Sequence, residues 1–215
     1  RELIVNGRIL EPRVEGYRLA LPGDALAARN SVRIAYENEY DHTGDGFHQF
    51  VDPEDGEEYL YSTFEPFYAH RLFPCFDQPD IKATYRLAVT APPAWQVVSN
   101  GAPESAAPAE DGRRRHVFEE TKRFSTYLFV LVAGPYEVFR SQHGAIPLGL
   151  YCRKSLAPYI DTDELFEITR QGLDFFGEFF GYDYPFGKYD QLFVPEFNAG
   201  AMENVAAVTH NETFI

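Results

Sequence analysis

The chain of 215 residues carries 19 basic and 33 acidic residues, which leaves a formal net charge of −14. This excess of negative charge argues against a protein that binds nucleic acid or docks on anionic membranes, because both of those surfaces attract basic patches. Hydrophobic residues make up 45% of the chain and aromatic residues 16%, enough to bury a globular core. No apolar run in the sequence reaches the length of a membrane span.

The first part of the chain is predicted to be a domain of short antiparallel strands. Residues 3–10 read as a strand, an Asn-Gly turn and a second strand, which is a strong hairpin pattern. Apolar residues alternate with polar or small ones around Ile34 and within residues 83–91. Further β-rich runs follow at residues 95–98, 115–118 and 126–132. Several short strands separated by turns predict a β-sandwich or a saddle-shaped sheet.

Two segments of this domain are predicted to be surface loops. Residues 102–112 are small and polar and contain prolines. Residues 37–58 contain nine acidic residues, with turn-forming glycines at positions 44, 46 and 56. A calcium loop is an alternative for the second segment, because hard cations bind clustered oxygen ligands, but the spacing does not match an EF-hand. We therefore expect a solvated acidic loop there.

A change in composition near residues 140–150 indicates a second unit. Ile146, Leu148 and Leu150 alternate as a strand, and residues 189–193 and 205–208 read as further strands. The spacing between them predicts one long helix over residues 162–180. Asp161 has the position of its N-cap, and Gly181 that of its C-terminal stop.

One face of this predicted helix is apolar and strongly aromatic. Residues at helical spacing mark the face: Leu165, Ile168, Gly172, Phe176 and Phe179, with Leu173 and Phe180 beside them. A face of this kind is more often packed into a core than used for a cofactor, so we expect it to be buried.

Residues 197–204, Phe-Asn-Ala-Gly-Ala-Met-Glu-Asn, are the most informative segment of the chain. Residues 200–204 resemble the Gly-Ala-Met-Glu-Asn signature of the zinc aminopeptidase N family, the gluzincin aminopeptidases. The chemistry of this segment suits peptide binding. Gly200 lets another backbone approach closely, an extended edge can add a peptide as an extra strand, and Glu203 offers a negative charge to an amino group.

The resemblance implies a role for each residue of the signature. Gly200 and Ala201 would contact the substrate backbone, and Glu203 would bind the amino terminus of the substrate. Met202, the only methionine of the chain, and Asn204 would support the site.

Two upstream blocks, residues 61–66 and 71–80, resemble further segments of the same family. In that family the Glu of the first block joins the signature Glu around the substrate amine, and Glu65 matches it. Two carboxylates on one ammonium are physically sensible, because hydrogen bonds to charged groups contribute about 1.5–3 kcal/mol each. Thr63 stands where the family usually has Gln, which leaves the side-chain preference open. In the second block we expect Arg71 and Asp77 to pair.

The sequence contains no recognisable zinc-binding motif. The six histidines include no two with the four-residue spacing that places both on one helical face for zinc. The resemblance implies zinc in the full-length protein, bound by a His-Glu-x-x-His helix that would follow the signature. No catalytic residue and no metal ligand is therefore expected in this chain, which by itself should bind no zinc and be inactive.

The expected fold class is mainly β. An N-terminal antiparallel β-sandwich or saddle domain would span residues 1–141, and the opening of a thermolysin-like α/β catalytic domain residues 142–215. The expected function is that of the N-terminal part of a zinc metallo-aminopeptidase, which removes N-terminal amino acids from peptides. This chain would supply the α-amino anchor and the backbone cradle. Its expected partners are peptides with a free N-terminus and the rest of the catalytic domain, with neither nucleic acid nor membrane.

Two other function classes stay open. One is a non-catalytic scaffold or binding protein of the same fold, although a scaffold has no use for two amine-binding carboxylates. The other is a β-sandwich adhesion or carbohydrate-binding module, which would leave residues 142–215 unexplained. Cys75 and Cys152 are too few for a disulfide framework, which favours a reducing, cytoplasmic location.

Overall fold

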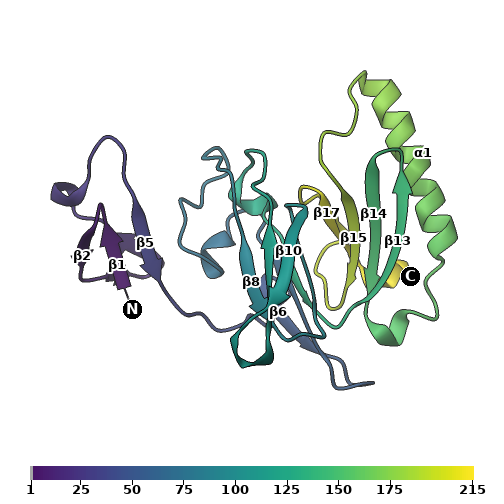
Figure 1. Cartoon of the computed structure of the whole chain (residues 1–215), viewed down its shortest axis with the longest axis horizontal. Helices are drawn as coiled ribbons and strands as arrows, with labels where there is room; N and C mark the ends of the chain where they lie inside the picture. Colours follow the sequence, from purple (N-terminus) through teal and green to yellow (C-terminus); the bar gives the residue numbers. More distant parts are fainter. Residues whose placement is uncertain (1) are drawn as a thin grey trace.

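The computed structural model describes residues 2–215 and confirms the predicted fold class. The described strands form five sheets, and these residues contain a single α-helix. Figure 1 shows the small sheet of β1, β2 and β5 at one end of the molecule and α1 at the other. The strands and the helix are, in chain order, β1 Glu2–Val5, β2 Arg8–Leu10, β3 Arg13–Glu15, β4 Arg18–Ala20, β5 Val32–Ala35, β6 Gly46–Val51, β7 Glu58–Thr63, β8 Ala88–Ala91, β9 Gln96–Ser99, β10 Pro103–Pro108, β11 Arg114–Phe118, β12 Leu131–Gly134, β13 Glu137–His143, β14 Ile146–Cys152, α1 Thr162–Phe180, β15 Tyr189–Val194, β16 Ala201–Met202 and β17 Ala207–Asn211.

The hairpin predicted at the N-terminus is confirmed. β1 and β2 pair antiparallel around Asn6 and Gly7, whose φ angles of 53° and 82° lie in the left-handed region. Tight hairpin turns need this conformation, which is why the Asn-Gly pair is so informative. β5 pairs with the other side of β1 and completes a three-stranded sheet.

The core of the N-terminal domain lies between two antiparallel sheets. One sheet has the order β6-β7-β12-β9 and the other the order β10-β11-β8. Side chains alternate along β7, so Leu60 faces this core while Tyr59 and Tyr61 face the opposite side of the sheet. The alternation prepares a second apolar face for the rest of the chain.

Two of the predicted loops are partly strands. Residues 103–108 form β10, which pairs with β11 although all six residues are exposed. Such a polar edge strand lacks apolar alternation, so its sequence resembles that of a loop. In the acidic segment, β6 and β7 form a hairpin, and Asp52 in the connection between them is fully buried. The expectation of a solvated loop was therefore wrong for the strand residues 46–51 and for Asp52, whereas residues 53–56 are exposed as expected.

The predicted pairing of Arg71 with Asp77 was also wrong. One oxygen of Asp77 lies 2.7 Å from His70 Nδ1, and the other accepts a hydrogen bond of 2.9 Å from the Thr126 hydroxyl. Arg71 instead lies 3.5 Å from Asp41.

The C-terminal part is a mixed sheet with the strand order β13-β14-β15-β17-β16. β14, β15 and β17 run parallel, and α1 is the crossover that joins β14 to β15. One face of this sheet packs against α1, through Leu148, Leu150 and Phe193. Its other face meets the N-terminal domain in what we call the interdomain core, made of Tyr59, Tyr61, Val98, Val130, Val132, Tyr136, Tyr151, Leu192, Val194, Phe197, Met202 and Ala207.

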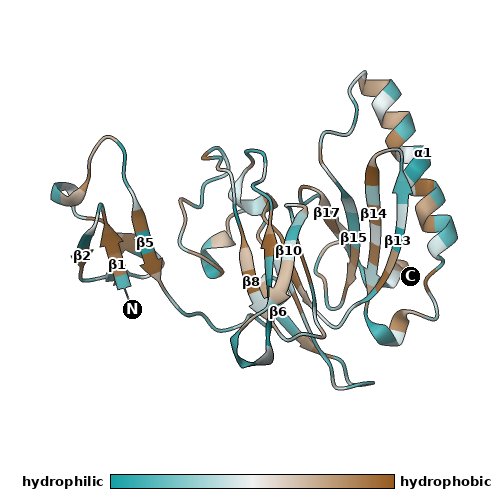
Figure 2. Ribbon diagram, in the orientation of Figure 1, coloured by the Kyte–Doolittle hydropathy of each residue, from teal (hydrophilic) through white to brown (hydrophobic). Residues whose placement is uncertain are grey.

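The bounds of the helix are those predicted, but its apolar face is less buried than predicted. Asp161 caps the helix by accepting a hydrogen bond of 3.0 Å from the Glu164 amide, and Gly181 ends it with φ 60°. The helix contacts the sheet through buried Phe166 and half-buried Leu165 and Leu173. Figure 2 shows hydrophobic residues on the strands and also in bands along α1.

The exposed part of that face consists largely of phenylalanines near the C-terminal end of α1. Phe176 and Phe179 are 54% and 69% exposed, so their predicted burial was wrong. The rings stack on one another instead, Phe175 on Phe179 and Phe176 on Phe180, each pair with centroids 5.8 Å apart. Within residues 2–215, none of the buried clusters includes these four rings.

A buried ionic network joins the N-terminal domain to the C-terminal sheet. Arg153 forms two hydrogen bonds of 2.8 Å with Glu212, and its third nitrogen contacts Asp52. Asp52 also accepts a bond of 2.7 Å from Ser155. Burial alone would raise the pKa of Asp52, but the hydrogen bonds from Ser155, the Glu54 amide and Arg153 hold that pKa below its ordinary value.

Replacing Arg153 by Met should strip both carboxylates of their partner. Removing one member of a buried ion pair costs about 3–5 kcal/mol, because an uncompensated charge stays buried. We expect a loss of about 3 kcal/mol in the free energy of unfolding, measured by urea denaturation. Arg170→Met is the matched control, since Arg170 pairs with Glu167 at 3.4 Å on the surface, and such pairs contribute about 0–1 kcal/mol. Equal losses in both variants would contradict the role of Arg153.

Candidate functional site

The signature lies at the free edge of the five-stranded sheet. Ala201 and Met202 form β16, which pairs antiparallel with β17 and is the terminal strand of the sheet. No strand within residues 2–215 covers its outer edge. Met202 points into the interdomain core and is 3% exposed, while Ala201 is exposed. The strand therefore has one side fixed by packing and one backbone edge able to pair with an incoming peptide.

The two carboxylates that the sequence singles out are both exposed and unpaired. Glu203 directly follows β16, and Glu65 lies two residues beyond β7. Neither forms an ion pair or a side-chain hydrogen bond with any residue in the described range 2–215. Phe64, next to Glu65, belongs to the hydrophobic cluster against which Val205 packs, so both segments border the same cluster although 138 positions separate the carboxylates in the sequence.

The residues around position 200 leave room for a side chain, so the packing of this chain does not require glycine there. A Cβ built on Gly200 would come no closer than 3.5 Å to another atom, the ring of Phe214, which is ordinary van der Waals contact. Its carbonyl accepts a hydrogen bond of 2.9 Å from the Asn211 amide, which aligns the residue with the end of β17. The open side of this glycine is thus available for close approach by another backbone.

Buried polar side chains hold the turn that follows the signature. Asn204 is 1% exposed and donates to the Thr209 hydroxyl at 3.2 Å. The Asn100 amide of the N-terminal domain donates to the carbonyls of Val205 at 2.9 Å and Leu128 at 2.8 Å. These contacts hold the backbone that follows β16, where Asn204 is buried and Glu203 is exposed.

Lys188 stabilises the same turn from within the C-terminal sheet. Its ammonium donates to the Ala206 carbonyl at 3.1 Å and to Asp190 at 2.7 Å, and the side chain is 7% exposed. Burial lowers the pKa of Lys188, and the adjacent Asp190 carboxylate opposes that shift. Ala206 has a positive φ of 63°, a strained conformation that the bond from Lys188 helps to hold.

The described residues do not fit a zinc site. No group of three or more His, Cys, Asp or Glu side chains within residues 2–215 is arranged to hold a metal ion. His210 lies in β17, stacked on Phe193 with ring centroids 5.4 Å apart, and burial lowers its pKa.

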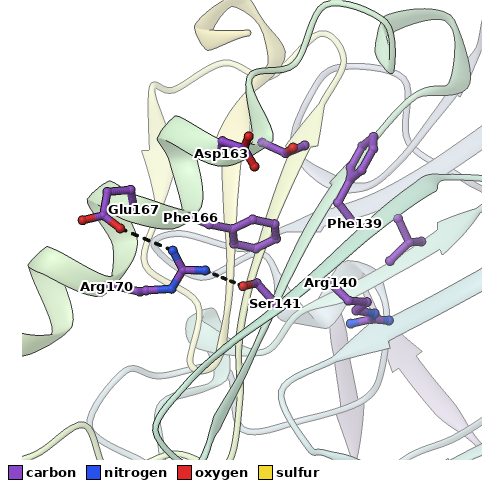
Figure 3. A pocket seen from close by; sticks show the side chains of 9 residues that line it. Phe139, Arg140, Ser141, Asp163, Phe166, Glu167 and Arg170 are labelled. Atoms are coloured by element: carbon purple, nitrogen blue, oxygen red, sulfur yellow. Dashed lines mark hydrogen bonds and ion pairs between the residues drawn. The ribbon is translucent and has the colours of Figure 1, made fainter.

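A hollow of about 650 Å³ lies between α1 and β13, on the helix side of the sheet (Figure 3). None of the predicted site residues lines it. Arg170 already donates to the Ser141 hydroxyl at 2.6 Å and lies 3.4 Å from Glu167. Because Arg170 is already paired with its own neighbours, we assign this hollow to the packing of α1 on the sheet.

Sequence reasoning missed the residues that hold the signature. Asn100, Lys188 and Asn211 are single polar residues in unremarkable surroundings, and no spacing rule marks them. Asn100 lies 105 positions before its partner Val205. Only the fold shows that these side chains bond to the backbone around the site.

Comparison with known proteins places the chain in a family. Residues 5–128 match the Peptidase M1 N-terminal domain, and residues 164–215 match the Peptidase family M1 domain. Aminopeptidase N of Streptomyces lividans is 47% identical over 220 residues, which cover 100% of this chain and 25% of the relative. Probable M1 family aminopeptidase 1 of Encephalitozoon cuniculi is 31% identical over 95% of this chain and 24% of the relative.

A human relative, glutamyl aminopeptidase, is 32% identical over 78% of this chain and 18% of its own length. The chain thus spans about a quarter or less of the curated relatives it matches. The signature strand β16 and all but the first two residues of α1 lie within the part matched by the M1 domain. The family expected from the signature and from the Glu65 block is confirmed, and the chain belongs to peptidase family M1.

Proposed function

We propose that this chain is the N-terminal part of a zinc metallo-aminopeptidase and that it anchors peptides with a free N-terminus. The observation that carries the proposal is the free edge of β16, which is followed directly by the exposed and unpaired Glu203. The names of the relatives support an aminopeptidase. The zinc ligands would come from other parts of the full-length protein.

The geometry suggests how a peptide binds. The peptide backbone would add to the outer edge of β16 as a further strand, with Gly200 and Ala201 as its partners. The α-ammonium group would then lie near Glu203, with Glu65 as the second carboxylate. An acylated amino terminus carries no positive charge, so the two carboxylates would select a charged amino terminus over an acylated one.

We also propose a domain division and a compartment for this chain. The expected domains span residues 1–141 and 142–215. β13 crosses this boundary at residues 137–143 and pairs with β14, which favours a transition at the start of β13. A cytoplasmic location is supported by two free thiols, Cys75 and Cys152. Separately, no helix among residues 2–215 is long and apolar enough to cross a bilayer.

Glu203→Gln and Glu65→Gln should each weaken catalysis by the full-length protein. Losing one charge-assisted contact costs at least about 1.4 kcal/mol, which corresponds to about a tenfold fall in kcat/KM on peptides with a free amino terminus. Steady-state kinetics on an aminoacyl substrate measures the change. Glu178→Gln, on the exposed surface of α1, is the matched control. Wild-type kinetics in both test variants would contradict the proposed binding site for the amino group.

Gly200→Ala should weaken catalysis without lowering stability. The open space around Gly200 accommodates a methyl group, so the free energy of unfolding should stay equal or rise by up to about 1 kcal/mol, since alanine restricts the unfolded chain. The added Cβ would obstruct the approaching peptide, and kcat/KM of the full-length protein should fall by about tenfold or more. Unchanged kinetics would show that no backbone approaches Gly200.

The isolated chain should neither turn over aminoacyl substrates nor bind zinc at a stoichiometric site. Equilibrium dialysis against Zn²⁺ and a fluorogenic amine-release assay measure these two properties. Turnover that a chelator abolishes would contradict this expectation. The sequence of the parent transcript beyond Ile215 separates the enzyme from the scaffold: a His-Glu-x-x-His helix supports the enzyme, and a continuous frame without it supports the scaffold.

A further inference from the structure

The segment before the signature is held by a buried histidine of the N-terminal domain. His48 lies on β6, is 1% exposed, and packs against Tyr61 with ring centroids 5.0 Å apart. Its Nε2 lies 3.1 Å from the carboxylate of Glu196, and its Nδ1 lies 3.0 Å from the amide nitrogen of Gly44. Glu196 is four residues before Gly200, so His48 links the N-terminal domain to the segment that leads into the signature.

The hydrogen bonds select one form of the His48 ring. A backbone N–H can only donate, so Nδ1 must accept from Gly44 and carries no proton. The remaining proton is on Nε2 and is donated to Glu196. A doubly protonated ring would turn an N–H toward the Gly44 N–H, so the geometry requires neutral His48. Burial lowers the pKa of His48, although the nearby Glu196 carboxylate opposes that shift.

Three further contacts dock the same segment on the N-terminal domain. The Tyr61 hydroxyl donates to the Glu196 carbonyl at 3.2 Å, and the Asn198 amide donates to the Thr43 carbonyl at 2.7 Å. Gly44, with φ 79°, lies so close that a Cβ there would be 2.5 Å from Asn198 and 2.9 Å from the Glu196 carbonyl. This close packing requires glycine at position 44.

The docked segment continues rigidly into the substrate strand. Phe197 is buried in the interdomain core, edge-on to Tyr61 at 5.8 Å. Asn211 holds the carbonyls of Phe197 and Gly200 with bonds of 2.9 Å each, from its side chain and its backbone amide. A displacement of Glu196 would therefore be transmitted through Phe197 to Gly200 and β16.

We propose that neutral His48 is a positioning residue for substrate binding: it locks residues 196–200 onto the N-terminal domain and thereby holds β16 and Glu203 in register. This inference rests on the proposed function for the role of β16, but the locking itself does not. Protonation of His48 in acid would break the bond from Gly44 and weaken the locking of the segment. The other titratable groups that act on the ring are Asp41, His42 and Glu196, and Tyr61 packs against it.

Hydrogen exchange in the full-length protein tests the locking. His48→Phe keeps a buried ring but loses both hydrogen bonds, so the amides of residues 196–204 should exchange at least about fivefold faster, the equivalent of one bond. The amides of β13 and β14 should not change. His143→Gln is the control, because it removes another histidine–carboxylate pair, with Asp174 at 2.7 Å, from the helix side of the sheet. Wild-type exchange in His48→Phe would overturn the proposal.

A second variant covers the case in which His48→Phe fails to fold. Asn198 is exposed, so Asn198→Ala should fold and lose only the bond to Thr43. We expect a smaller acceleration confined to the same amides. His48→Gln, which keeps a donor for Glu196, should partly restore protection. Acceleration spread evenly over the chain would indicate general destabilisation and would also overturn the proposal.

Steady-state kinetics of His48→Phe distinguishes this inference from the proposed function. If both hold, His48→Phe raises KM for peptides with a free amino terminus more than it lowers kcat. Faster local exchange with unchanged KM would keep the locking and reject β16 as the substrate strand.

The pH dependence of stability tests the neutral form of His48. Because only neutral His48 fits, its contribution to stability is present above the ordinary histidine pKa of about 6.5 and is lost as the pH falls below it. The difference in Tm between wild type and His48→Phe should therefore narrow from pH 7.5 to pH 5, and a constant difference would contradict the neutral form.

Discussion

The guanidinium of Arg153 lies between Asp52 of the N-terminal domain and Glu212 at the end of the C-terminal sheet. Its position depends on the burial of the hairpin connection between β6 and β7, and it secures the edge of the interdomain core. That core contains tyrosines of the N-terminal domain and apolar residues of β15 on opposite sides. With these two layers joined, the backbone around the signature can be held from both domains at once.

The carboxylates of this chain differ in burial and in pairing. The buried Asp52 and Asp190 and the half-buried Asp77 all have close partners. An unpaired charge in those places would cost several kcal/mol. Glu65 and Glu203 are the opposite case, exposed and without a partner among residues 2–215. Solvent carries their charge at little cost, and they stay available for a cation that arrives with a ligand.

Backbone strain is concentrated at both ends of the signature. Among the described residues, four other than glycine have a positive φ, and two of them, Glu196 at 51° and Ala206 at 63°, flank residues 200–204. Each such residue costs on the order of 1–3 kcal/mol. The strain persists because Tyr61 and Lys188 bond to the very carbonyls of these two residues. The strand between them is thereby presented in one conformation, which reduces the ordering that binding would otherwise require.

Local physics in the sequence determined much of this protein. The Asn6-Gly7 turn and the bounds of α1 follow from turn and cap chemistry that involves only near neighbours. The signature and Glu65 were identified as candidate site residues by their chemistry and family resemblance. The aromatic face of α1 and the strand β10 were misjudged, because periodicity reports which residues share a face but not what covers that face.

The tertiary structure alone decided which side chains meet. His48 and Glu196 are 148 positions apart, and Arg153 and Asp52 are 101 positions apart. Nothing in the local pattern around a single buried histidine or arginine names its partner, since the pairing depends on how two sheets dock. The sequence therefore identified the strand and the carboxylates of the candidate site, and the packing of the two domains determined what holds them in place.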